Sequence, residues 1–465
     1  MEFSSQQILR LCTLFHRALL AQDKVKVHSL GWELLKKKHL LRPGEACMAL
    51  NHFAQLKVLD HDLWQGFSDA LPEVFVEIDC KTLGLTTNAY ARAMLKHDVA
   101  FQLLARRAET LLRQGRMQGR HMAMIVNGFS KLRVRDEALM EAVSTEVTSS
   151  AEKLNAVDLA SVANGYARLW MHDKEVLDAL REPTMSALPQ FNMQNIAMII
   201  HAHGRFLRHD AELLGALLAE LRRRCEASRE VVPAHNLAPI IHAMATRLSW
   251  CTPDFLKVVD MSLPTAIKEM KLPDTFLTVA GLKNITGWHV SQELRNAVFS
   301  HCLQQMRRFS SGGVVAVLEL ALKLQHHSVD FWNRALSACQ ESLATTSWEP
   351  ANIASLALVL SELPEGIEKA ELVDAVAEMA QGLEALPLET LVDLAAAFAR
   401  LCRPQARLFS EAARHFARIP AAPGEDQPKR LLEALWRMSP EMFEQHPTLS
   451  QAADAINLDL SPGNC

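Results

Sequence analysis

The sequence predicts an all-α fold, a right-handed α-solenoid of about eleven helix-turn-helix repeats of about 38 residues each. The first observation is a helical hairpin in the stretch Asp158–Leu180. Its first apolar stripe has helical spacing, a short break ends at Asp173, and a second stripe follows. Asp173 can cap the second helix. A hairpin of this size cannot bury both stripes alone, so it needs copies of itself on either side.

The second observation is that the hairpin recurs along the whole chain. The residues at the position of Tyr166 are Phe15, Phe53, Tyr90, Phe129, Tyr166, His203, Met244, Leu282, Ala321, Leu360 and Phe398. Their mean spacing is (398 − 15)/10 = 38.3 residues. The surrounding letters recur as well, as NGFSKL at Asn127–Leu132, NGYARL at Asn164–Leu169 and AFARL at Ala397–Leu401. We call these recurring residues the marker positions.

The repeats can be followed in order along the first half of the chain. The first spans Ser5–Leu40 and ends before the breaker Arg42-Pro43-Gly44. Repeats two to five, Glu45–Arg224, are the most regular. Their second helices are expected to follow a recurring N-cap, the candidates being Asp62, Asp98, Asp136, Asp173 and Asp210. The next interval lengthens to 41 residues, which predicts an extended loop at Cys225–Pro233.

The second half is less regular. Repeats six and seven, through Trp250–Thr286, are degenerate, and the superhelix is expected to bend there. Repeats nine and ten, Glu349–Ala417, regain the pattern but are acidic. A proline-rich break and a short amphipathic helix, Arg430–Met438, follow. We therefore predict a solenoid over residues 5–418 and a capping helix and tail over residues 429–465.

Composition restricts the class of protein. Hydrophobic residues form 49% of the chain, yet it has no uncharged apolar run long enough to predict a transmembrane helix. The nine cysteines are odd in number and lack a CxxC pair, which favours a reducing compartment over disulfides or a zinc site. Residues 1–250 carry 31 Lys+Arg and 27 Asp+Glu, a net charge of +4. Residues 251–465 therefore carry 49 − 31 = 18 Lys+Arg and 53 − 27 = 26 Asp+Glu, a net charge of −8. The two halves are expected to bind different partners.

Two columns of equivalent positions are the candidate binding residues. Two residues before the markers lie Asn51, Asn88, Asn127, Asn164, His201 and His242, and two residues after them lie Arg17, Arg92, Lys131, Arg168 and Arg205. The columns are four residues apart and share one helix face. Amides and imidazoles can bond base edges while cations neutralise phosphates, so this ladder suits single-stranded RNA. Two structural readings stay open: the helix dipole favours cations in a last turn, and buried amides can brace neighbouring repeats.

Further basic clusters accompany the columns. Arg113, Arg116 and Arg120 lie between repeats and are added to the RNA-binding candidates, while Arg133 and Arg135 occupy a turn and Arg222–Arg224 end the fifth repeat. The tryptophans are read as packing residues. No catalytic or phosphate-loop motif is present, and Ser310-Ser311-Gly312-Gly313 reads as a linker. No cofactor or metal is expected, since His201 and His203 would face different sides of a helix.

With its 38-residue unit and its NGFSKL, NGYARL and AFARL segments, the chain resembles the octotricopeptide and heptatricopeptide repeat proteins and the repeats of RAP-domain and FAST-kinase-like proteins. The resemblance covers residues 5–417, but the chain lacks the Pro-Pro-Pro-Glu-Trp-like stretch, and its C-terminus does not resemble a RAP domain. It implies an organellar, mostly mitochondrial, RNA-binding protein.

Two functions follow as hypotheses. The first is a non-catalytic RNA-binding scaffold, most concretely a structural component of the mitochondrial ribosome in the matrix. Its basic half would bind rRNA and its acidic half neighbouring proteins. The second is an armadillo-like protein-protein adaptor that binds no RNA. Salt dependence separates them, because five phosphate contacts would give a slope of about −3.5 in log K against log salt.

Overall fold

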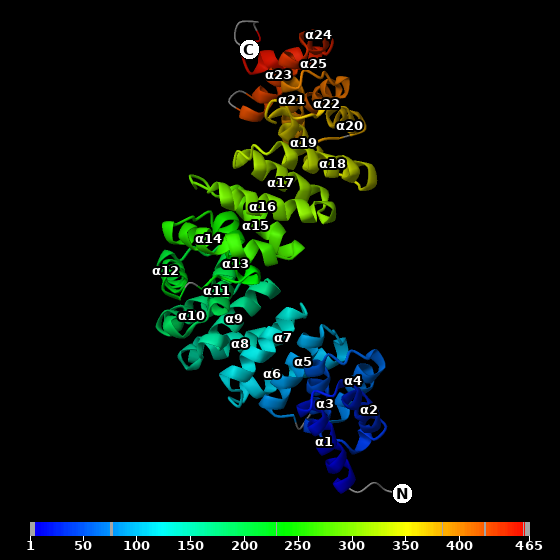
Figure 1. The fold of residues 1–465 in the computed structure, drawn as a ribbon, viewed down its shortest axis with the longest axis vertical. Coiled ribbons are helices and arrows are strands. Elements are labelled where there is room, and N and C mark those ends of the chain that lie inside the picture. Colours follow the sequence, from blue (N-terminus) through cyan, green and yellow to red (C-terminus); the bar gives the residue numbers. More distant parts are fainter. Residues whose placement is uncertain are drawn as a thin grey trace. The chain divides into compact units, whose positions relative to one another are not determined.

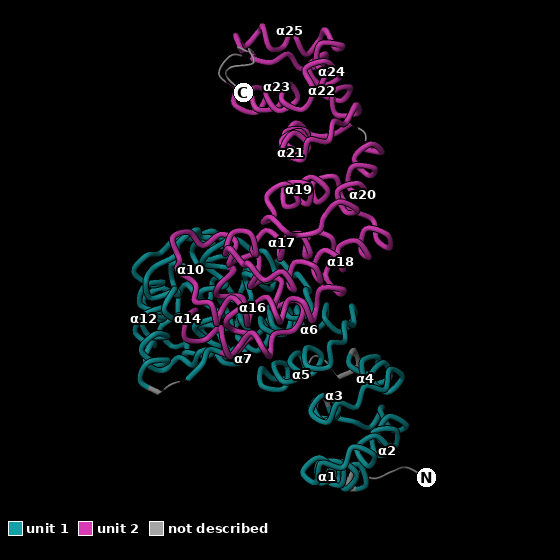
Figure 2. The backbone as a smooth tube through the Cα atoms, turned by 45° about the horizontal axis from the view of Figure 1, so that its top comes forward, with its two compact units in different colours: residues 1–232, 243–258 teal, residues 233–242, 259–465 magenta. Residues whose placement is uncertain are grey.

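The computed structural model describes residues 5–74, 78–228, 230–383, 385–422, 425–458 and 460. Within these ranges the regular elements are helices and no strand occurs (Figure 1). The chain divides into two compact units, residues 1–232 with 243–258 and residues 233–242 with 259–465 (Figure 2). None of the helices in the described ranges is long and apolar enough to cross a membrane. The all-α prediction is confirmed.

Unit 1 consists of helical hairpins stacked in two layers. The first helices of the hairpins pack against one another and form layer A, while the second helices form layer B. Layer A contains α1 (Ser5–Leu20), α3 (Pro43–Leu56), α5 (Cys80–Ala93), α7 (Gly119–Lys131), α9 (Ala156–Leu169) and α11 (Met193–Arg205). Layer B contains α2 (Lys24–Leu35), α4 (His61–Val74), α6 (Asp98–Arg113), α8 (Glu137–Ser150), α10 (Lys174–Ala187) and α12 (Ala211–Ser228).

Unit 2 repeats the arrangement. Its layer A contains α13 (Ala234–Ile241), α15 (Leu272–Asn284), α17 (Ser311–Lys323), α19 (Pro350–Ser361), α21 (Leu388–Arg400) and α23 (Asp426–Met438). Its layer B contains α16 (Gln292–Gln305), α18 (Val329–Thr345), α20 (Ala370–Gln381) and α22 (Ala406–Arg418). Helix α14 (Pro253–Ala266) contains the division between the units, and α24 (Pro440–Glu444) and α25 (Pro447–Ala455) end the described chain.

The marker positions form the core of each hairpin, as the repeat pattern predicts. All eleven are buried, and in unit 1 Phe15, Phe53, Tyr90, Phe129 and Tyr166 are at most 1% exposed. The Tyr166 hydroxyl donates over 2.8 Å to the Met140 carbonyl on α8, the second helix of the preceding hairpin. Edge-to-face aromatic contacts also join neighbouring hairpins, since the ring centroids of Phe101 and Phe129 are 4.8 Å apart. The solenoid of helical hairpins is thereby confirmed within each unit.

Glycine allows the helices of layer A to approach closely. A Cβ atom on Gly128 would lie 2.4 Å from Cγ2 and 3.0 Å from the carbonyl oxygen of Thr87 on α5. On Gly165 it would lie 2.3 Å from Cγ1 of Val126 on α7. Both glycines immediately precede a marker, in the NGF and NGY segments. These glycines set the distance between neighbouring first helices, and hence between the side chains those helices expose.

The turns inside the hairpins share one conformation. The residue four positions after a marker has a positive φ at Lys57, Met94, Arg133, Trp170 and Leu207, between 53° and 56°. This left-handed residue follows the last turn of each first helix and redirects the chain towards the second helix. Side chains at this position therefore lie beside the C-terminal ends of layer A.

The predicted N-caps are correct at three of five turns. Asp136, Asp173 and Asp210 accept from the backbone of Leu139, Val176 and Leu213. Asp62 and Asp98 are not caps, because they lie in the first turns of α4 and α6. Asp60 and His97 accept those bonds instead, from Leu63 over 3.1 Å and from Ala100 over 3.2 Å. Helix α4 therefore begins two residues, and α6 one residue, earlier than the polar pattern indicates.

Three further local predictions are corrected. The predicted loop at Cys225–Pro233 is shorter than expected, since α12 continues to Ser228 and buries Cys225, and only residues 230–233 are described as irregular. The predicted linker at Ser310–Gly313 is the start of α17, with Ser310 at its N-cap position. The lengthened interval instead contains a π-helical turn at His242–Arg247, directly after α13. The terminal helix α23 begins at Asp426, and the predicted tail extends into residues outside the described ranges.

Candidate nucleic-acid interface

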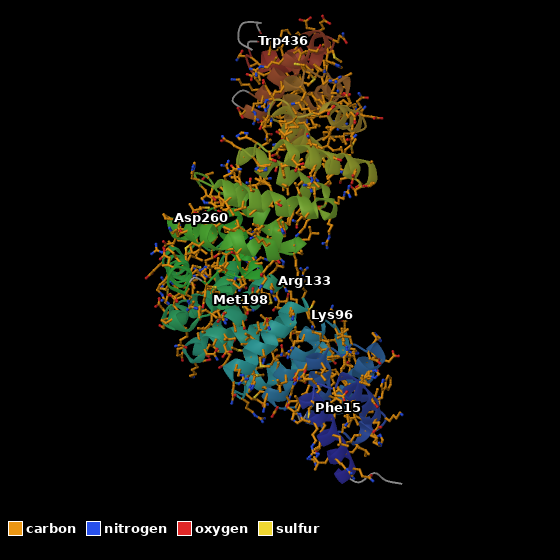
Figure 3. All side chains as sticks on the ribbon, in the orientation of Figure 1. Phe15, Lys96, Arg133, Met198, Asp260 and Trp436 are labelled. Carbon is orange, nitrogen blue, oxygen red and sulfur yellow. The ribbon has the colours of Figure 1, made fainter. Side chains whose placement is uncertain are left out.

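Each first helix exposes one stripe of side chains at helical spacing. On α7 the stripe is Arg120, Met124, Asn127 and Lys131, and these side chains are exposed or half-buried while most other residues of the helix are buried. The same positions on the adjoining helices are Lys81, Leu85, Asn88 and Arg92 on α5, Val157, Ser161, Asn164 and Arg168 on α9, and Gln194, Met198, His201 and Arg205 on α11. We call these four parallel stripes of unit 1 the A-face. Met198 and Arg133, which lies just beyond the A-face, are labelled in Figure 3.

Four members of the amide column, Asn88, Asn127, Asn164 and His201, lie on the A-face, but the members of the column have different environments. Asn164 is buried at 4% exposure, and its Oδ1 lies 3.1 Å from Nδ1 of His201 on the next first helix. This contact braces α9 against α11, so the structural reading of the column holds at Asn164, and the predicted contact of this amide with a base edge is not favoured. The amides of Asn51, Asn88 and Asn127 are half-buried and make no hydrogen bond to any described residue. His242 is half-buried in the π-helical turn.

The cation column lies at the C-terminal ends of the first helices. Arg17, Arg92, Lys131 and Arg168 are exposed, and Arg205 is half-buried. The Arg205 guanidinium lies over the ring of Trp170, 3.2 Å from the ring centroid. Arg133 and Arg247 join this column, because each lies near enough to a column arginine to affect its titration. Loss of solvation and the charges of Arg247 and Arg133 lower the pKa of Arg205.

Arg168 is subject to the same effects. Although the side chain is exposed overall, partial loss of solvation around its guanidinium and the positive charge of Arg133 lower the pKa of Arg168 below its ordinary value. Like charges therefore gather at this end of the first helices. We define the cationic edge as the cations at the ends of α5, α7, α9, α11 and the π-helical turn. Its members are Arg92, Lys131, Arg133, Arg168, Arg205 and Arg247.

No described carboxylate lies within ion-pairing distance of the cationic edge. The arginines of layer B differ: Arg181 pairs with Asp210 at 2.9 Å, and Arg222 pairs with Asp254 at 2.6 Å. Arg223 and Arg224 both bond Glu220. The run Arg222–Arg224 is therefore neutralised within the protein. The cationic edge differs from this run, because its positive charges have no carboxylate partner in the described ranges.

The remaining predicted cluster lies elsewhere. Arg113 ends α6 and pairs with Glu109 at 2.8 Å, Arg116 follows in the turn, and Arg120 begins α7. Arg120 and Lys131 are eleven residues apart on one helix, which corresponds to about 16 Å. The structure thus does not bring Arg113, Arg116 and Arg120 together with the cationic edge.

Unit 2 lacks an equivalent edge in the described ranges. Arg400 pairs with Glu362 at 2.6 Å, and Lys283 pairs with Glu319. Glu362, Glu365, Glu368, Glu371 and Asp374 are all exposed. The charge difference between the two halves of the sequence is therefore displayed on the surface.

Sequence reasoning did not select Arg133, Arg247 and Trp170 as site residues. The sequence predicts a packing role for Trp170, but this residue is 48% exposed. The signal that could have found Trp170 and Arg133 is their shared place four residues after a marker, in the left-handed turn. The described residues contain no group of His, Cys, Asp and Glu side chains that could hold a metal ion.

The fold and the exposed stripes define an all-helical repeat protein with one cationic edge. The model of the RNA-editing substrate-binding complex 6 protein family matches residues 75–347, which is more than half of the chain. The chain belongs to this family. The match includes the whole cationic edge and excludes Arg17.

Curated protein sequences and solved structures do not assign the chain to a further family. No curated protein sequence matches the chain. Among solved structures, a homology model of the full-length AP-3 complex in an intermediate open conformation has 9% identity and a TM-score of 0.34, with 98% of this chain and 89% of that chain covered. A circular tandem repeat protein with novel repeat topology has 14% identity and a TM-score of 0.19, with 97% of both chains covered.

Proposed function

We propose that this protein is a non-catalytic RNA-binding scaffold that holds single-stranded RNA on the A-face of unit 1. The observation that carries the proposal is the cationic edge, a set of six cations at the ends of successive first helices that have no carboxylate partner among the described residues. The arginines Arg181, Arg222 and Arg224 of layer B, in contrast, are paired. The family's description as an RNA-editing substrate-binding complex protein supports an RNA ligand and a multiprotein setting.

RNA would bind here mainly through its phosphates. Each cation that neutralises a phosphate releases condensed counterions, and this release gives affinity without sequence preference. Bases lying across the stripes would meet the half-buried Met124, Asn127 and Met198 side chains. The amides of Asn88 and Asn127, with no protein partner among the described residues, are available to base edges.

The test compares two charge reversals in the full chain. Arg92, Lys131 and Arg168 are changed together to Glu in one variant, and Arg113, Arg116 and Arg120 in the other. Both variants change the net charge equally, but only the first alters the cationic edge. We expect the first variant to lose binding to labelled single-stranded RNA and the second to retain most of it, with helical content unchanged in both.

Equal losses in the two variants would contradict the placement of RNA on the cationic edge. Unfolding of the first variant, measured by circular dichroism, would instead indicate a structural role for these cations. Arg113, Arg116 and Arg120 stay candidate contacts, but Arg113 already has a carboxylate partner.

We further propose that the exposed carboxylates of α19–α20 bind neighbouring proteins of a larger assembly, in a mitochondrial matrix. A structural role in the mitochondrial ribosome is the narrower form of this proposal. Native co-purification separates the forms, since a ribosomal component brings rRNA and ribosomal proteins, and an RNA-editing complex component brings other RNAs. Protease protection in isolated organelles tests the compartment.

A second candidate function is the armadillo-like adaptor without RNA binding. The half-buried amides of Asn51, Asn88 and Asn127 favour it, because such amides can bond the backbone of an extended peptide. Peptide binding through amides would depend little on salt. Strong salt dependence of ligand binding would therefore reject the adaptor, and its absence would reject the RNA scaffold.

A further inference from the structure

A shallow pocket that is open to solvent lies beside the cationic edge, between two successive hairpin turns of unit 1. It has a volume of about 460 Å³ and lies between the α9–α10 turn and the α11–α12 turn. Its apolar wall is formed by Leu177, Phe206 and Leu207, and His172, Lys174 and Arg208 supply polar groups. We call it the corner pocket. Its size is within the range of small-molecule sites.

The corner pocket adjoins the most crowded part of the cationic edge. Phe206 directly follows Arg205, and His172 lies two residues after Trp170, whose ring the Arg205 guanidinium covers. The imidazole of His172 meets the Phe206 ring edge to face, with centroids 4.9 Å apart. An apolar pocket and an unpaired guanidinium group therefore lie next to each other at the end of α11.

Arg208 and Asp173 of the pocket are already partnered, whereas the cations of the edge have no carboxylate partner among the described residues. Arg208 pairs with Asp178, and the Asp173 carboxylate accepts from the Val176 backbone and the Ser144 hydroxyl. In contrast, Nε of Arg205 is buried and has no hydrogen-bond partner in the described part of the chain. A buried donor without a partner is costly unless a ligand supplies the acceptor.

We propose that the corner pocket receives one unstacked base of a single-stranded RNA, while Arg205 and Arg168 bind the phosphate beside that base. A flat, largely apolar ring joined to a phosphate matches the pocket and the adjoining cations. Trp170 acts as a positioning residue, because its ring holds the Arg205 guanidinium in place. The inference rests on the proposed function and adds the place at which a base is bound.

An acidic peptide is the other ligand that could combine apolar and anionic groups. RNA is favoured because the edge continues past the pocket through Arg133, Lys131 and Arg92, each on an earlier first helix or its turn. A ligand that binds along the cationic edge needs an anionic group for each successive cation. A nucleic acid supplies one phosphate in every nucleotide.

The test removes single bases from the RNA and one apolar group from the pocket. A labelled single-stranded RNA is prepared with each nucleotide in turn made abasic, and binding to the full chain is measured by fluorescence anisotropy. Because base stacking on a protein contributes substantially at each base, we expect one position where base removal weakens binding about five-fold or more. In the Leu207→Asn variant that penalty disappears.

The variant is chosen to keep the backbone. Leu207 has φ 53° and is 61% exposed, and Asn is among the residues that tolerate this conformation. Val329→Asn is the matched control, because Val329 is 52% exposed on a helix of unit 2. Its abasic penalties should equal those of the wild type. If Leu207→Asn does not fold, Phe206→Leu removes the aromatic wall instead.

The outcomes separate this inference from the proposed function. Binding of RNA with unchanged abasic penalties in Leu207→Asn would overturn the corner pocket and leave the scaffold proposal standing. Absence of RNA binding by the wild type at low salt would overturn both. Binding of an acidic peptide at Arg168 and Arg205 in place of RNA would overturn both as well.

Discussion

Replacing Gly128 by alanine tests whether glycine sets the spacing of layer A. The added Cβ would lie 2.4 Å from Thr87 Cγ2 and 3.0 Å from the Thr87 carbonyl oxygen, both well inside ordinary contact distance. The Thr87 side chain is held by a 2.9 Å bond to the Leu83 carbonyl, and the carbonyl oxygen of Thr87 belongs to α5 itself. Helices α5 and α7 would have to separate.

The magnitude follows from two opposing effects. Alanine stabilises a helix interior by about 0.5–1 kcal/mol relative to glycine. Overpacking of a tight contact costs about 1–3 kcal/mol. Gly215 of α12 provides the matched control, because an added Cβ there meets nothing within 4 Å. We expect Gly215→Ala to stabilise the protein. The free energy of unfolding of Gly128→Ala should be about 1–3 kcal/mol lower than that of Gly215→Ala, because only Gly128→Ala has the overpacking cost.

Urea unfolding followed by circular dichroism measures both variants. In a repeat protein the stability is a sum of repeat and interface terms, so a weaker α5–α7 interface should also broaden the transition of Gly128→Ala. Equal stabilisation by the two substitutions would refute the reasoning, since it would mean that the first helices have room for a side chain at Gly128.

Two other predictions concern salt and pH. If the six cations of the cationic edge each neutralise one phosphate of single-stranded RNA, the logarithm of the binding constant should fall with log salt at a slope of about −4. A filter-binding titration measures this slope, and a value near zero would exclude phosphate contacts. Burial and the neighbouring His16 lower the pKa of His52 to about 4. Between pH 6.5 and about 4 the unfolded chain then binds a proton that the folded chain does not, so the free energy of unfolding should decrease as the pH falls through this window. His52→Gln should remove that part of the decrease in urea titrations, and an identical pH profile in the variant would contradict it.

Much of the fold follows from periodicity. Burial of an apolar stripe is a local property of a sequence, and every marker from Phe15 to Phe398 is buried as its spacing predicts. The role of Gly128 and Gly165 could not be deduced in the same way. Their letters recur in the NGF and NGY segments, but a close approach is visible only when the neighbouring helix is in place.

The sequence predicts only part of the candidate site, because contacts between helices are not visible in a repeat pattern. The cation column was found because a fixed register puts Lys131 and Arg168 on equivalent surfaces. Whether a cation is paired depends on other helices, so the sequence could not distinguish Arg168 from the neutralised Arg222. The burial of Asn164 and the exposure of Trp170 depend on stacking and on a left-handed turn, and neither is encoded in residue type alone.

The unpaired guanidinium groups at the ends of α9 and α11 have a consequence for the free protein. Groups of one sign held side by side repel each other, and that repulsion is part of the folded state's free energy as long as no anion is bound. Any polyvalent anion that collects there relieves it, so occupancy and folding become thermodynamically linked. Sulfate or phosphate in a buffer would then both stabilise this protein and compete with its ligand, whereas chloride at equal ionic strength would do less of either.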